Sequence, residues 1–156
     1  MLAAKERSKS AVISVELAED LPAVRAVGAE LNQVWLNLLD NALDAIDEGG
    51  TVRVVGRHEL DHVLVEVVDN GAGIPPETLW RIFEPFYTTK GVGEGTGLGL
   101  DIVRRLLQRQ DGEIEAASAV GHTVFKVYLP IADASDQSES ARPEPRRSAL
   151  IGPHSD

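Results

Sequence analysis

Cysteine is absent from this chain, and its absence excludes disulfide bonds, thiolate zinc sites and cysteine nucleophiles. No apolar run approaches the length that is needed to span a bilayer. The first residues, MLAAKERSKSAV, are charged where a signal peptide would carry an apolar core. We therefore expect a cytosolic protein whose present segment makes no membrane contact.

Positive charge is in short supply, with 15 Lys and Arg against 25 Asp and Glu, and the formal net charge is -10. An acidic surface repels nucleic acid and anionic membranes, so we expect neither as a partner. The hydrophobic fraction of 43% is enough to build a core, and a length of 156 residues is typical of one domain.

Three parts of the chain differ in composition. Residues 1–10 are polar and resemble the frayed end of a preceding element. Residues 132–156 are rich in Ser, Pro and charge, and such a segment buries too little apolar surface to order itself. We therefore expect a disordered polar tail at 132–156 and a folded domain at 11–131.

Within the folded part, alternating or continuous apolar runs predict strands at 11–20, 51–60, 62–69, 113–120 and 123–130. Apolar residues at helical spacing predict helices at 30–47 and 98–110, a short helical stretch at 75–82, and residues 21–27 are expected to be extended. Because the strands come in adjacent pairs, we predict an α+β fold. This fold is a two-layer α/β sandwich with a mixed, mostly antiparallel sheet and helices on one face.

A glycine-rich run, GVGEGTGLGL, occupies residues 91–100. It has neither the GxxxxGK[ST] spacing of a Walker A loop nor the GxGxxG spacing of dinucleotide and protein-kinase loops. Taken alone, the run fits either a flexible linker or an anion site. In the second case, backbone amides at the start of the following helix would bind a phosphate.

One face of the predicted helix 30–47 carries a row of polar side chains. The row consists of Glu30, Gln33, Asn37, Asn41 and Asp44. Because Asn is a poor helix former, two Asn one turn apart need an explanation. Asn37 and Asn41 indicate either a solvated face or two neutral oxygen ligands for a hard cation such as Mg²⁺.

The segment VEVVDNGAGIPPE, residues 65–77, places an acid at the end of an apolar strand. Its Asn-Gly pair is also a strong signal for a hairpin turn. A buried carboxylate needs a hydrogen-bond donor, and the exocyclic amine of adenine is one such donor for Asp69. Gly71 and Gly73 would then leave room for the base.

The segment FEPFYTTK, residues 83–90, holds three of the five Phe and Tyr residues of the chain. These aromatic residues indicate either a hydrophobic anchor for a surface loop or the base of a lid. In a lid, the aromatic side chains would pin the base of the loop and Lys90 would meet a phosphate.

In this order, the segments NLLDNA, DNGAGI, FEPFYTTK and GTGLGL resemble the N, G1, F and G2 boxes of the catalytic ATP-binding domain of sensor histidine kinases. The resemblance covers about residues 11–131. It implies the α/β sandwich shared with gyrase B, the large heat-shock chaperones and MutL, with an ATP lid loop. It also implies binding of ATP and Mg²⁺, transfer of the γ-phosphoryl group to a histidine on a separate dimerisation domain, and a response regulator downstream.

The resemblance implies roles for single residues. Asn41 matches the Mg²⁺ ligand, Asn37 stands beside it at the metal and phosphates, and Asp69 matches the acid that receives the adenine amine. Lys90 matches a lid residue that reaches the phosphates. The remaining matched nucleotide-binding positions are Gly71, Gly73, Ile74, Phe83, Phe86, Thr89, Gly95, Thr96, Gly97, Leu98, Gly99, Leu100 and Thr123.

Two features depart from the family pattern. Related ATPases place a Glu that activates water where this chain has Asn37, which favours transfer to another acceptor over hydrolysis. The family also needs a phosphoacceptor histidine on a separate dimerisation helix, and we expect no such helix in this chain. The one segment that resembles a phosphoacceptor site, HELD at His58, lies at the end of a predicted strand.

Two alternatives stay open, namely a serine protein kinase of the anti-sigma-factor type and a non-catalytic ATP-dependent conformational module. The presence of FEPFYTTK argues against the first.

Overall fold

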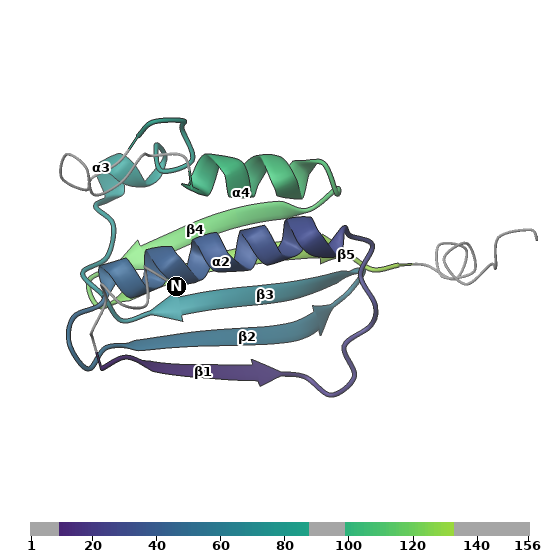
Figure 1. Ribbon diagram of the computed structural model, residues 1–156, viewed down its shortest axis with the longest axis horizontal. Coiled ribbons are helices and arrows are strands. Elements are labelled where there is room, and N and C mark those ends of the chain that lie inside the picture. Colours follow the sequence, from purple (N-terminus) through teal and green to yellow (C-terminus); the bar gives the residue numbers. More distant parts are fainter. Residues whose placement is uncertain (1–9, 88–98, 133–156) are drawn as a thin grey trace, which may run out of the picture.

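A computed structural model describes residues 10–87 and 99–132 of the chain. The elements, labelled as in Figure 1, are β1 Val12–Leu17, α2 Gly28–Ala45, β2 Thr51–Glu59, β3 His62–Asp69, α3 Pro76–Leu79, α4 Gly99–Gln108, β4 Glu113–Ala119 and β5 His122–Pro130. The predicted strands and helices are all present, although α3 ends at Leu79 and not at residue 82. The expected extended segment 21–27 contributes only a single bridge, between Val24 and Ile131.

The five strands form one sheet in the order β1-β2-β3-β5-β4 (Figure 1). β1 runs parallel to β2, and every other neighbouring pair is antiparallel. Parallel neighbours need a crossover connection, and α2 supplies it between β1 and β2. The predicted mixed, mostly antiparallel sheet is therefore confirmed.

Both long helices lie on one face of the sheet, as Figure 1 shows. Side chains alternate between the two faces along a strand, so Val63, Val65 and Val67 of β3 join the core under the helices. The other buried hydrophobic residues of this core are Val34, Leu38, Ala42, Ile46, Val52, Ile82, Val103, Leu107, Phe125, Val127 and Leu129. The two-layer sandwich with its helices on one face is therefore confirmed.

The buried side chain of Gln110, just after α4, fastens the start of α2. The Gln110 Oε1 atom accepts a hydrogen bond from the Val27 N–H at 2.7 Å, and its Nε2 atom donates to Glu30 Oε2 at 2.9 Å. Val27 caps α2 without a side-chain hydrogen bond of its own. One amide therefore ties the two helices together at this end of the domain.

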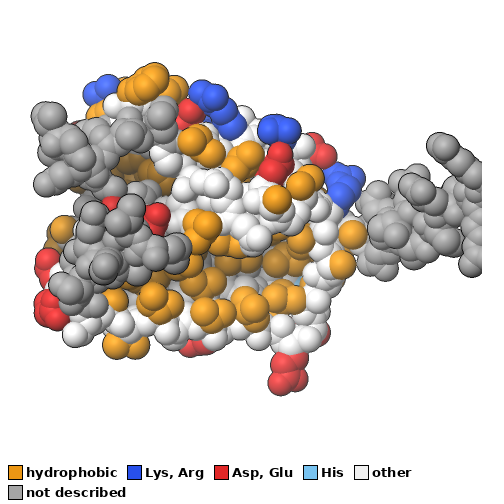
Figure 2. All heavy atoms as spheres, viewed as in Figure 1, with side chains coloured by type: hydrophobic (Ala, Val, Ile, Leu, Met, Phe, Trp, Pro, Cys, Tyr) orange, Lys and Arg blue, Asp and Glu red, His pale blue; other side chains and the backbone are white. Residues whose placement is uncertain are grey.

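The edge strand β1 is the least covered part of the helix-bearing face. Its residues Ile13, Val15 and Leu17 pair in register with the inward positions of β2, yet they are 51%, 62% and 57% exposed. Figure 2 shows hydrophobic side chains gathered over the lower part of this face, where β1 and β2 lie.

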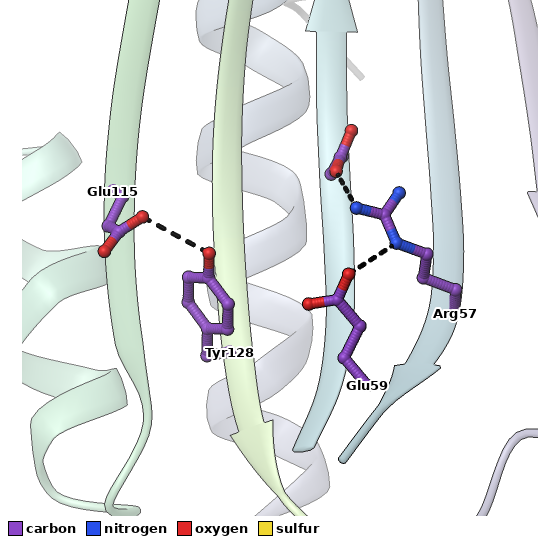
Figure 3. Close-up of polar contacts among 5 residues, drawn as sticks. Arg57, Glu59, Glu115 and Tyr128 are labelled. Atoms are coloured by element: carbon purple, nitrogen blue, oxygen red, sulfur yellow. Dashed lines mark hydrogen bonds and ion pairs between the residues drawn. The ribbon is translucent and has the colours of Figure 1, made fainter. Parts of the chain in front are cut away.

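The opposite face of the sheet carries polar contacts between neighbouring strands (Figure 3). The Arg57 guanidinium contacts Glu59 at 3.0 Å and Glu66 at 2.9 Å. The Tyr128 hydroxyl donates to Glu115 at 3.3 Å, and burial together with the negative charge of Glu115 raises the pKa of Tyr128. These contacts lie on the face opposite to the candidate site, and Leu64 and Val124 are buried on the same face.

Candidate functional site

Asp69 lies at the end of β3 with its side chain on the helix-bearing side of the sheet. It is 2% exposed, and its Oδ1 atom accepts a hydrogen bond from the Gly71 N–H at 2.9 Å. Burial raises the pKa of Asp69 above its usual range, and the Gly71 hydrogen bond and the nearby His122 partly offset that rise. The site thus holds a strong hydrogen-bond acceptor in a poorly solvated position.

Thr123 of β5 lies directly opposite Asp69 in the antiparallel pairing and is also 2% exposed. Its Oγ1 atom is 2.7 Å from the Ser118 Oγ atom of β4, and Ser118 Oγ accepts a hydrogen bond from the Ile74 N–H at 2.7 Å. The motifs do not single out Ser118. The tight turn around Gly121 could have done so, because it places Ser118 and Thr123 opposite each other.

Gly71 and Gly73 allow the loop after β3 to pack closely against the backbone of neighbouring elements. A Cβ atom on Gly71 would clash with the Ala45 carbonyl oxygen at the end of α2. Gly73 has a φ of +87°, and a Cβ atom there would lie 2.6 Å from the Ala119 carbonyl oxygen. These contacts show close backbone packing of both glycines against α2 and β4, and their role in leaving room for a base stays a prediction.

The polar row on α2 extends from the start of α4 towards this loop. The Asn37 Nδ2 atom donates to the Gly99 carbonyl oxygen at 3.2 Å, and its Oδ1 atom accepts from Gln33 Nε2 at 3.1 Å. Asn41 is half-buried one turn further on, and the next turn ends at Ala45, whose carbonyl accepts from the Ala72 N–H. The Asn pair therefore lies between the start of α4 and the loop after β3.

The side-chain oxygens on this row fit a metal ion that takes most of its ligands from water and substrate. Across residues 10–87 and 99–132, no group of three or more His, Asp or Glu is placed to hold a metal ion. Mg²⁺ commonly takes one or two protein oxygens and completes its shell with water and substrate phosphates. The amide oxygens of Asn41 and Asn37 fit that limited contribution, although Asn37 Oδ1 already accepts one hydrogen bond.

The aromatic residues at the predicted base of the lid behave differently from one another. Phe83 is half-buried and packs edge to face against Phe125, with ring centroids 6.5 Å apart. Ile74, from the loop after β3, packs against the same core. Phe86 is 75% exposed with a φ of +65°, so it does not help Phe83 to pin the segment. Tyr87 packs on the core in its place.

Several predicted lid positions lie outside the described residues, namely Thr89, Lys90, Gly95, Thr96, Gly97 and Leu98. Their roles stay predictions. Gly99 and Leu100 are described at the start of α4, where Gly99 is exposed and Leu100 packs against the core. The predicted helix start beside the glycine-rich run is thus present.

Residues 26–133 match the family described as histidine kinase-, DNA gyrase B- and HSP90-like ATPases. The chain belongs to this family. The sensor kinase CckA of Brucella abortus is 40% identical over 146 residues, which cover 83% of this chain and 15% of that protein. The sensory histidine kinase/phosphatase NtrB of Rhodobacter capsulatus is 39% identical over 127 residues, which cover 72% of this chain and 35% of that protein.

Solved structures of histidine kinases share the fold. The catalytic domain of histidine kinase ThkA has a TM-score of 0.71 and 30% identity, and the match covers 82% of each chain. Full-length ShkA in complex with AMPPNP also has a TM-score of 0.71 and 30% identity, over 85% of this chain and 28% of that one. The family domain is therefore the catalytic, ATP-binding part of a histidine kinase.

The chain spans 15% to 24% of the length of CckA and of the sporulation kinases E and C of Bacillus subtilis. None of the helices in the described part of the chain has the length and hydropathy to cross a bilayer.

Proposed function

We propose that this domain binds Mg·ATP and transfers the γ-phosphoryl group to a histidine on a separate dimerisation domain. The acceptor would pass the group to a response regulator, and the reaction would take place in the cytoplasm. Residues 11–131 would form the ATP-binding domain. The observation that carries the proposal is the buried Asp69 opposite Thr123, beside the Asn37 and Asn41 row of α2.

Recognition of the base follows from the chemistry of this pair. The ionised Asp69 carboxylate can only accept, and the exocyclic amine of adenine donates. A carbonyl group in the same place, as in guanine, would leave the buried carboxylate without a donor. Ile74 in the loop after β3 is partly buried against the core and would offer an apolar surface to the ring.

At the phosphate end of ATP, neutral side-chain oxygens would bind the metal ion and backbone amides would bind the phosphates. Asn41, with Asn37 beside it, would hold Mg²⁺, which supplies neutralisation of the phosphate charge when it is bound. Lys90 and Thr89 would contact the phosphates from the lid. The amides of residues 95–100 would contact them at the start of α4.

Asn37 bears on the choice between transfer and hydrolysis. An amide cannot take a proton from an attacking water, and both ends of the Asn37 side chain already form hydrogen bonds, to Gly99 and from Gln33. The residues assigned here would therefore act by positioning and charge neutralisation, and the attacking group would come from the acceptor histidine.

The test incubates the domain with γ-labelled ATP and a separately expressed dimerisation domain that bears the acceptor histidine. The same acceptor with that histidine changed to alanine is the control. We expect an acid-labile, base-stable label on the first acceptor and none on the second. An acid-stable label on serine would show a serine kinase, and nucleotide binding without transfer would show a conformational module. Either result would contradict the proposal.

A further inference from the structure

Ser118 is not among the residues matched to the nucleotide site, yet it joins two parts of that site. We propose that Ser118 is a positioning residue for the nucleotide base, whose hydroxyl holds the loop after β3 and the side chain of Thr123 in one arrangement. This inference rests on the proposed ATP site and concerns its base-binding side.

Backbone amides of the loop after β3 donate hydrogen bonds to four different elements, and the first of them joins the Asn70 N–H to the Thr51 carbonyl of β2. The Gly71 N–H donates to the Asp69 carboxylate, and the Ala72 N–H donates to the Ala45 carbonyl at the end of α2. The Ile74 N–H donates to Ser118 on β4 at 2.7 Å. Loss of the Ser118 hydroxyl would therefore release the end of the loop that leads into Ile74 and leave the other three bonds in place.

The loop has little freedom to form a different contact with β4. Gly73, directly before Ile74, is so close to β4 that a Cβ atom would lie 2.6 Å from the Ala119 carbonyl and 3.3 Å from Ser118 Oγ. The Ser118 hydroxyl thus forms its hydrogen bond where the backbone of the loop already packs against the backbone of β4.

The two hydroxyls also set a direction for hydrogen bonding. Ser118 Oγ already accepts from Ile74, and it lies 2.7 Å from Thr123 Oγ1. If Ser118 donates its proton to Thr123, each oxygen accepts one hydrogen bond and the Thr123 proton stays available for a base nitrogen. Hydrogen bonds arranged head to tail in this way strengthen one another. Ser118 would then both place the loop and orient the Thr123 hydroxyl opposite Asp69.

The experiment compares S118A and S118T with the parent domain, and S14A is the matched control. Ser14 is a strand serine on β1, at the sheet edge opposite to β4. By calorimetry, we expect S118A to bind ADP about tenfold more weakly, which is the effect of losing one or two partly buried neutral hydrogen bonds. S118T keeps the hydroxyl and should recover most of the affinity, and S14A should bind like the parent.

Two further measurements separate positioning from a general loss of structure. In phosphoryl transfer, S118A should raise KM for ATP and leave kcat at saturating ATP within about twofold, because ground-state binding is what it loses. Without nucleotide, amide exchange at Ile74 should quicken in S118A, while exchange at Ala72 stays as in the parent.

Equal ADP affinity in S118A and the parent, or unchanged exchange at Ile74, would overturn the role of Ser118 and leave the proposed function intact. A parent that binds ADP but transfers no phosphoryl group would contradict only the transfer, and the ADP affinities would still decide the role of Ser118. A parent that binds no ADP would contradict both proposals.

Discussion

Asp69 and Thr123 lie opposite each other on β3 and β5, and each side chain is 2% exposed. Burial of an acid beside a hydroxyl costs free energy unless both groups are hydrogen-bonded. Thr123 has a protein partner in Ser118, and Asp69 has one in the Gly71 amide. A carboxylate can accept more than one hydrogen bond, so Asp69 retains the capacity to receive a donor from a ligand.

Substitution of Asp69 by Asn should weaken ATP binding by about 10- to 100-fold, because a hydrogen bond to a charged acceptor is replaced by one to a neutral amide. Calorimetric titration with ATP measures the change. Asp47→Asn removes an exposed acid just after α2 and should leave the affinity unchanged. An Asp69→Asn domain that binds ATP like the parent would show that the base lies elsewhere.

The same variant should be more stable than the parent at neutral pH. Because burial raises the pKa of Asp69, the folded chain takes up this proton at a higher pH than the unfolded chain, whose value is near 3.8. The parent therefore loses stability as the pH rises from the unfolded pKa through the folded pKa, and Asn carries no such loss. Asn does not titrate and can still accept the Gly71 hydrogen bond.

Melting curves of the parent and Asp69→Asn between pH 3 and pH 8 test this expectation. The variant should have the higher Tm at pH 7, and its advantage should shrink as the pH falls towards the unfolded pKa. A constant difference across the range would mean that the charge of Asp69 is not the cause.

Asn41→Ala should leave nucleotide binding without Mg²⁺ unchanged and remove the gain in affinity that Mg²⁺ brings. The expectation follows from the place of Asn41, half-buried on the polar row one turn from Asn37. ADP titrations with Mg²⁺ and with a chelator measure both affinities. A variant with the full Mg²⁺-dependent gain would remove Asn41 from the metal site.

Gly73→Ala should destabilise the fold and weaken ADP binding, because the new methyl group would meet the Ala119 carbonyl at 2.6 Å. Gly49 is the matched control, since it has a similar φ of +77° but open space around its Cβ position. Gly49→Ala should cost only the strain of positive φ, about 1 kcal/mol, and Gly73→Ala clearly more. Equal losses of unfolding free energy in urea for the two variants would show that the loop accommodates the methyl group at Gly73 without added destabilisation.

Much of the fold was predictable because its signals are local. The apolar spacing of α2 predicted which side would be buried, and Val34, Leu38, Ala42 and Ile46 are all in the core. The apolar run of β3 predicted a buried strand, and this strand pairs on both sides. The exposed Phe86 was not predictable, because whether an aromatic side chain packs depends on the path of the segment around it.

The order of the four motifs in the sequence alone determined the resemblance to histidine kinases, the predicted acid at the base site and the predicted Asn pair for Mg²⁺. These signals are readable because each depends on residue type and spacing within a short segment. Only the tertiary structure decided that Gly71 and Gly73 pack too closely against α2 and β4 to carry a side chain, and that Ser118 joins the loop to Thr123. The contacts concerned are to backbone of α2 and β4 and between paired strands, so they exist only once the chain has folded.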